Sequence, residues 1–288
     1  MEIKAKILKL VQEKKSDLPT LPITINKIIS VASDKQSTIE ELEEAISYDQ
    51  AMTSKLLKLS NSLYYAQRTK VETIKRAITV IGFDEIIGIS LGMEILSSFK
   101  NASGVNLDMS SLWMHSIGVA TASKELAKRT NSVIARKMFI PSLLHDIGKV
   151  IFLAYFKDEY VKVQQFAIDE KKSLHFAENA IFKINHALLS ALLMKRWNFP
   201  QSIELPCRFH HNPESSSIKF RHQAFIINIA DYIALKAGIG RSANSAPVVL
   251  RNSLEMVNLN QSRLELIIDQ LRRKKAEIND FFKITTES

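Results

Sequence analysis

Five of the seven histidines in this chain of 288 residues, together with two aspartates, are candidate metal ligands on otherwise apolar segments. These residues are His115, His145, Asp146, His186, His210, His211 and Asp231. Burying a carboxylate beside an imidazole is unfavourable by several kcal/mol unless a cation compensates the lost hydration. A divalent cation would satisfy these side chains together, so the pattern predicts a metal site.

The mixture of nitrogen and oxygen ligands indicates which ions this site would take. The first predicted ligand set is His115, His145, Asp146 and Asp231. Two imidazoles and two carboxylates suit Fe, Mn, Ni, Mg or Co, or Zn, better than a structural zinc bound by thiolates. His186 and the pair His210 and His211 are predicted as ligands of a second ion, with Asp146 as the bridge. We therefore expect one or two divalent ions.

Lys149 is the predicted phosphate contact if the site is catalytic. It lies four residues after His145, so on a helix the two side chains share a face. Two ions with a shared hydroxide can attack phosphorus without a nucleophilic side chain. Asp146, as the metal bridge, and Lys149 are thus the predicted catalytic residues. The remaining histidines, His175 and His222, are interpreted as structural, and no organic cofactor site is predicted.

Helical periodicity along the whole chain positions these residues on helices. Eight glycines and seven prolines are few for this length, and no strand pattern competes, so the predicted fold is all-α. Helices are expected at about 2–14, 23–32, 39–47, 49–59, 73–81 and 84–99, then in a region from 112 to 240 with breaks at 131–132, 199–200 and 211–213, and at 261–282. A capping-box pattern at Thr38 and Glu41 begins the third, and Gly82 separates the fifth from the sixth.

Two polar stretches predict the organisation into parts. Residues 101–110 form the clearest linker, and residues 241–247 form a second polar stretch. We therefore predict an N-terminal helical subdomain at 1–104, a metal-site domain at 105–240 and a C-terminal helical extension at 241–288.

Composition and charge narrow the setting. The single cysteine, Cys207, suits a reducing cytoplasm, and the first residues lack a secretory signal. Charged residues interrupt the apolar stretches 77–99 and 138–156, so no membrane span is expected. The net charge of +9 is spread along the chain, with one basic cluster at 271–275 and no interleaved aromatics. Such a pattern supports non-specific association and does not favour nucleic acid as the partner.

The order of the metal-site residues resembles that of the HD superfamily of metal-dependent phosphohydrolases: His115, then His145 and Asp146, then Asp231, on separate helices. Four further segments resemble the HDOD family (HD-related output domain): Leu-Pro-Thr-Leu-Pro at 18–22, the helix segment 47–62, residues 77–82, and Arg-Trp-Asn-Phe-Pro at 196–200. The resemblance covers roughly residues 15–240.

What this resemblance implies is a bacterial signal-transduction protein in which a helical N-terminal subdomain packs on an HD-like core. Such proteins act as regulatory output or scaffolding modules, so a signalling protein is the expected partner. Members often lack metal ligands, whereas this chain keeps the set. Residues 145–149 and the later histidines also resemble cyclic-dinucleotide phosphodiesterases with an HD-GYP core. However, Asn-Pro-Glu-Ser at 212–215 replaces their Gly-Tyr-Pro segment, and Ser111 stands where three-metal forms have glutamate.

Two functions remain open from the sequence. The first is a non-catalytic output module with a retained metal site, which the whole-chain resemblance favours. The second is a metal-dependent phosphohydrolase or phosphodiesterase acting on a nucleotide or cyclic dinucleotide, which the intact ligand set and Lys149 favour.

Overall fold

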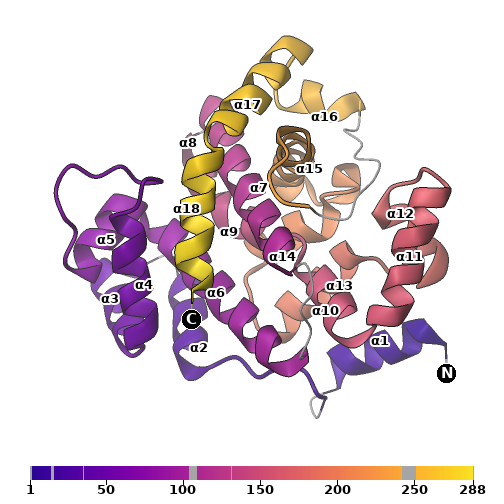
Figure 1. Cartoon of the computed structure of the whole chain (residues 1–288), viewed down its shortest axis with the longest axis horizontal. Helices are drawn as coiled ribbons and strands as arrows, with labels where there is room; N and C mark the ends of the chain where they lie inside the picture. Colours follow the sequence, from indigo (N-terminus) through magenta and orange to yellow (C-terminus); the bar gives the residue numbers. More distant parts are fainter. Residues whose placement is uncertain are drawn as a thin grey trace.

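The computed structural model describes residues 2–13, 16–34, 36–103, 109–130, 132–241 and 251–287, and the regular structure within these ranges is entirely helical (Figure 1). The predicted all-α class is confirmed. The helices are α1 (Ile3–Gln12), α2 (Ile23–Ser33), α3 (Ile39–Ser47), α4 (Gln50–Ser60), α5 (Ile74–Ile81), α6 (Phe83–Ser103), α7 (Met109–Thr130), α8 (Ser132–Lys137), α9 (Phe139–Leu144), α10 (Ile147–Tyr155), α11 (Lys157–Asp169), α12 (Leu174–Ile181), α13 (His186–Arg196), α14 (Gln201–Phe209), a 3-10 turn η1 (Pro213–Ser215), α15 (Ile218–Ala237), α16 (Arg251–Met256), α17 (Gln261–Arg273) and α18 (Lys275–Thr286).

The helices α2 to α5 form one end of the molecule, and their boundaries follow from local capping. Thr38 Oγ1 accepts from the Glu41 backbone N–H, and the Glu41 carboxylate accepts from the Thr38 backbone N–H. The predicted capping box is therefore present and satisfies two otherwise unpaired N–H groups of α3. Gly82, at φ 108°, ends α5 in a conformation that suits glycine, and α6 follows at once, as predicted.

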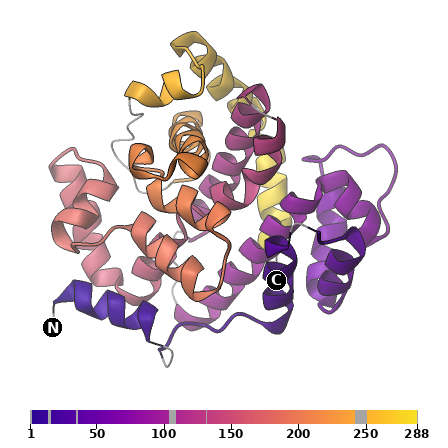
Figure 2. The ribbon, with the colours of Figure 1, turned by 180° about the vertical axis from the view of Figure 1, so that it is seen from behind.

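The helices that carry the predicted ligands form the part of the molecule next to α2 to α5. Helix α15 lies against α7, which also contacts α9, while α10 contacts α13 and α13 contacts α14. Figure 2 shows the molecule from the other side, where α1 lies at the end opposite α3 to α5. Helix α1 contacts α13, and the Arg196 guanidinium donates to the backbone carbonyls of Val11 and Glu13. The subdomain boundaries proposed from the sequence stay a prediction.

The C-terminal extension differs from the single helix expected at 261–282. The chain bends at Lys274, so α17 packs against α15 and α18 against α7, α4 and α6 (Figure 1). Trp113 Nε1 on α7 donates to Thr285 Oγ1 at 3.1 Å, and the Leu63 N–H donates to the Asp280 carboxylate at 2.9 Å. Because the bend falls within good helix-forming residues, local propensity does not reveal it, and burial of two apolar faces on different neighbours decides it.

The predicted linkers fall mostly outside the described residues. Helix α6 continues to Ser103 and α7 begins at Met109, so the linker expected at 101–110 is helical at both ends, and 104–108 are not described. Of the polar stretch at 241–247 the structure describes Arg241, and of the break at 131–132 it describes Ser132, the first residue of α8; the other residues of both lie outside the described ranges. In the described helices, none combines the length and the apolar character needed to cross a bilayer.

The packing of α18 predicts the first stability result. Phe281 is fully buried, with its ring centroid 5.0 Å from that of Tyr64. We expect Phe281→Ala to lower the free energy of unfolding by about 3–5 kcal/mol, since it removes a buried aromatic ring and leaves a cavity. Urea denaturation followed by circular dichroism measures this change. Phe282 is only partly buried, so Phe282→Ala is the matched control. Equal losses of unfolding free energy in both variants would contradict the burial of the Phe281 face of α18 against its neighbours.

Candidate metal centre

The first predicted ligand set comes together in the structure. His115 lies on α7, His145 directly follows α9, Asp146 directly precedes α10, and Asp231 lies on α15. Ligand atoms of His115, His145 and Asp146 lie within 4.8 Å of one another. The His115 Nε2 to Asp231 Oδ1 distance is 3.0 Å, and the His145 Nε2 to Asp146 Oδ2 distance is 3.3 Å. All four side chains are buried.

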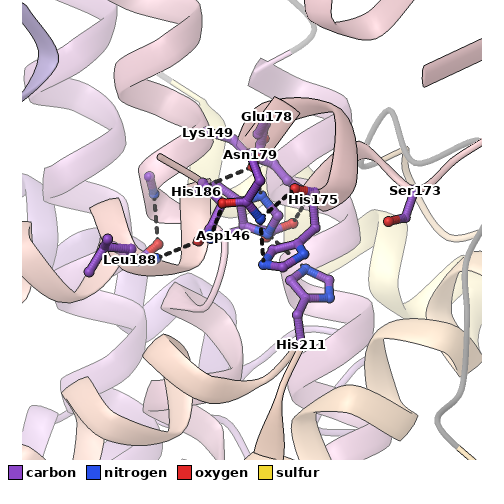
Figure 3. A network of polar contacts seen from close by, with 12 residues as sticks. Asp146, Lys149, Ser173, His175, Glu178, Asn179, His186, Leu188 and His211 are labelled. Atoms are coloured by element: carbon purple, nitrogen blue, oxygen red, sulfur yellow. Dashed lines mark hydrogen bonds and ion pairs between the residues drawn. The ribbon is translucent and has the colours of Figure 1, made fainter. Parts of the chain in front are cut away.

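The second predicted set also comes together, on the other oxygen of Asp146. Ligand atoms of His186, His210 and His211 lie within 4.8 Å of one another. Asp146 Oδ1 is 3.2 Å from His186 Nε2, which is 2.9 Å from His211 Nε2 (Figure 3). Asp146 Oδ1 is also 3.9 Å from His210 Nε2. Asp146 therefore lies between the two sets, as a bridging carboxylate must. Pro206 within α14 does not move His210 out of the site.

Backbone and side-chain acceptors fix the orientation of three imidazole rings. His145 Nδ1 faces the Ser142 carbonyl at 2.8 Å, and His210 Nδ1 faces the Cys207 carbonyl at 2.6 Å. His186 Nδ1 faces Glu178 Oε2 at 2.6 Å. A carbonyl or carboxylate can only accept, so each Nδ1 carries the proton and each Nε2 presents a lone pair to the centre. This is the ring orientation of a metal-binding histidine.

Several buried atoms of the two ligand sets lack hydrogen-bond partners among the residues that the structure describes. They are Nε2 of His115, His145 and His210, and Oδ1 of Asp146 and Asp231; Nδ1 of His115 also lacks one. Buried polar atoms without partners are rare in proteins, and here five of them converge. When two ligand atoms each lie about 2.1 Å from one ion and the ligand–ion–ligand angle is about 90°, the two ligand atoms are about 3.0 Å apart. The His115 to Asp231 spacing fits that geometry, so these residues fit divalent ions.

Two local contacts hold the turn between α9 and α10 against α13. Ser190 Oγ donates to the His145 carbonyl at 2.9 Å and accepts from the Gly148 N–H at 2.9 Å. A Cβ on Gly148 would lie 2.2 Å from the His186 carbonyl oxygen. Glycine at this position therefore lets the turn that carries His145 and Asp146 approach the first turn of α13.

Lys149 lies at the centre as predicted, but its nearest partner is a carboxylate. Its Nζ is 2.6 Å from Asp146 Oδ2, and the side chain is buried. An ammonium in this place compensates part of the buried negative charge. The predicted role as a phosphate contact stays a prediction.

The electrostatics of the centre favour the charged forms of Asp146 and Asp231 and the neutral forms of His210 and His211. Burial raises the pKa of Asp146, but His145, Lys149 and His186 lower it more, so it lies well below its usual range. Burial and neighbouring imidazoles hold the pKa values of His210 and His211 well below theirs. For His145 burial lowers the pKa, but the Asp146 carboxylate outweighs it and the net shift is upward. Deprotonated imidazoles and carboxylates are the forms that bind metals.

Two further residues lie beside the centre. The ring centroid of His175, which the sequence predicts to be structural, lies 4.6 Å from that of His211, and burial lowers its pKa to about 4. Glu178 was not selected at all, although it is fully buried and contacts His186 (Figure 3). A charged residue within the apolar run of α12 was the available signal. His222 lies near the start of α15, nine residues before Asp231.

The HDOD domain family model matches residues 18–213, about two thirds of the chain, and the chain belongs to this family. The match includes both α2 to α6 and most of the metal centre, with Asp231 beyond its end. An uncharacterized protein of Treponema pallidum (strain Nichols) is 24% identical over 216 residues, which is 74% of this chain. The chain spans only 42% of the length of that relative.

Solved structures share the fold. An HDOD domain protein of unknown function from Geobacter sulfurreducens has a TM-score of 0.79 at 24% identity, covering 99% of this chain and 98% of its own. A protein from Marinobacter aquaeolei VT8, provisionally named a signal transduction protein, has a TM-score of 0.80 at 17% identity. The match covers 99% of this chain and 66% of that protein's chain. A protein from Shewanella amazonensis SB2B, provisionally named a phosphohydrolase, has a TM-score of 0.72 at 20% identity, covering 98% of each chain.

The close approach at Gly148 predicts a second stability result. We expect Gly148→Ala to lower the free energy of unfolding by about 3 kcal/mol, because the new methyl group meets backbone that cannot shift. Gly88→Ala is the matched control: its Cβ would meet the side chains of Ile140 and Phe139 at 3.1 Å, and these can adjust by a few tenths of an ångström. Chemical denaturation of both variants tests this. A larger loss for Gly88→Ala would show that the α10 to α13 approach is not the tighter constraint.

Proposed function

We propose that this chain is a regulatory HDOD protein in signal transduction, in which divalent ions hold the central helices in the conformation that a partner protein recognises. The observation that carries this proposal is the convergence of unpartnered buried atoms on His115, His145, Asp146, His210 and Asp231. Ions that bind there connect α7, α9, α10, α14 and α15 at one point. Metal binding then contributes directly to the stability of this arrangement.

A small cavity lies beside Asp146, with a volume of about 10 Å³. Its other walls are mainly apolar, with Leu96, Leu143 and Val150 among them, and Asp146 is the one predicted ligand that lines it. The name of the Marinobacter structure, a signal transduction protein, agrees with the proposed regulatory role.

A phosphohydrolase or phosphodiesterase is the second candidate, and the position of Asp146 favours it. This carboxylate lies between two ligand sets and beside the Lys149 ammonium, which is a suitable arrangement for two ions and a phosphate oxygen. The ions would supply polarisation of the phosphoryl group and an activated water. Of the residues around them, Asp146 would hold both ions and Lys149 would orient the phosphate. A phosphohydrolase is also the name of the Shewanella neighbour.

Metal content and metal removal test the proposed centre. We expect the purified protein to bind two divalent ions, measured by elemental analysis after dialysis against Mn²⁺, Fe²⁺, Ni²⁺ or Zn²⁺ in separate experiments. With ions at about 100 times their Kd, each site adds about 2.7 kcal/mol to the free energy of unfolding. Chelation should therefore lower Tm by roughly 5–10 °C per site. A metal-free protein with the same Tm before and after chelation would contradict the proposal.

Single substitutions test whether the two ligand sets bind separate ions. We expect His115→Gln to keep the ion at His186, His210 and His211, and His211→Gln to keep the ion at His115, His145, Asp146 and Asp231. Asp146→Asn should lose both, since Asp146 contacts both sets. Asp158, exposed at the start of α11, provides the control Asp158→Asn. Calorimetric titration counts the ions. Loss of both ions in His211→Gln would indicate one site rather than two.

Hydrolysis distinguishes the two candidate functions. For the regulatory role we expect no turnover of bis-p-nitrophenyl phosphate or of a nucleotide panel by the metal-loaded protein. Turnover that falls by about 100-fold in Lys149→Met while two ions remain bound would instead establish the enzyme, with Lys149 stabilising charge on the phosphoryl group. Lys195→Met, on an exposed side chain of α13, is the matched control.

A further inference from the structure

Glu178 is a carboxylate with no exposed surface, placed on α12 beside the second ligand set. Its two oxygens accept from different sides. Oε1 accepts from the Tyr160 hydroxyl at 2.8 Å, and Oε2 accepts from the His186 backbone N–H at 2.8 Å and faces His186 Nδ1 at 2.6 Å. Burying a carboxylate is unfavourable unless hydrogen bonds replace its hydration, and these three contacts do so.

Two of the three contacts are to His186: one holds its backbone N–H and the other holds its imidazole ring. His186 is the first residue of α13, so its N–H has no acceptor within the helix, and Glu178 supplies one. A negative charge is also favourable at a helix N-terminus. The neighbouring Asn185 caps the same turn by accepting from the Leu188 N–H at 2.9 Å. The backbone position of His186 is therefore set by α12 and by the cap together.

The ring of His186 is fixed by the second contact. Because Glu178 Oε2 can only accept, His186 Nδ1 carries the proton and Nε2 presents its lone pair. That lone pair faces Asp146 Oδ1 at 3.2 Å and His211 Nε2 at 2.9 Å, in the middle of the second set (Figure 3). A carboxylate that accepts from the distal nitrogen of a ligand histidine orients the ring and raises its basicity toward the metal.

We propose that Glu178 is a positioning residue for the second ion: held by Tyr160, it fixes the tautomer and place of His186 so that Nε2 binds metal. This inference rests on the proposed metal-binding function. It assigns a role to a side chain that does not touch the ion. It also separates the two ligand sets, since, among the described residues, Glu178 forms hydrogen bonds to His186 of the second set and to no ligand of the first.

Graded variants test the proposal by calorimetric titration with Mn²⁺. We expect Glu178→Gln to weaken the second ion about tenfold, because the amide keeps an acceptor but loses the charge, and Glu178→Leu to weaken it about 100-fold. The first ion should bind as in the unchanged protein. Glu170→Gln, exposed at the end of α11, is the matched control. Unchanged affinity for the second ion in Glu178→Gln would overturn the proposal, as would equal weakening of both ions.

A measurement on the ion-free protein keeps the proposal testable if the leucine variant does not fold. Long-range ¹H–¹⁵N correlation spectra report which ring nitrogen of a histidine carries the proton. We expect His186 to carry it on Nδ1 in the unchanged protein and to shift toward the other tautomer in Glu178→Gln. A proton on Nε2 in the unchanged protein would overturn the role of Glu178. Because no metal is needed, this result is independent of whether the centre binds ions at all.

Discussion

The structure depends on the burial of one carboxylate, Asp146, at the turn between α9 and α10. Only 2% of its surface is exposed, and it is surrounded by the imidazole of its neighbour His145 and by those of His186 and His210 from two other segments. Its single ammonium partner, within the described ion pairs, is Lys149 on one oxygen. The other oxygen faces His186 and His210 and lacks a hydrogen bond. A buried carboxylate oxygen without a hydrogen bond is unfavourable, so this constraint asks for a further cation at the point where the helices meet.

The remaining helices can be understood by how they hold that point. Helix α7 carries His115 and, two residues earlier, Trp113, whose indole donates to Thr285 on α18. Helix α18 in turn contacts α4 through the ion pair of Lys58 and Glu287. Helix α7 of the metal centre thus contacts α18 of the C-terminal extension, and α18 contacts the N-terminal helix α4. The packed contacts from α7 through α18 to α4 are therefore continuous.

The sequence allowed the fold class and the ligand sets to be predicted because both rest on local patterns. The capping box at Thr38 and the glycine break at Gly82 act over a few residues, and the ligands are polar residues in apolar helices, which is a conspicuous signal. The bend at Lys274 and the role of Glu178 were not predictable in this way. The bend is decided by which surfaces are available to α17 and α18. The role of Glu178 depends on α12 lying beside α13, which no spacing along the chain reveals.

An intact ligand set by itself does not distinguish a regulator from an enzyme. Ions that satisfy unpartnered atoms from five helices stabilise the fold whether or not they act on a substrate, so each ligand would be needed in both cases. The distinction lies in what surrounds the ions. A hydrolase needs an open coordination position and space for the group that it attacks. In the described part of the chain, the partly exposed histidines beside the second set are His175 and His211. A substrate that approached from their side would pass these two rings, whereas an ion needs no such opening once the helices have closed around it.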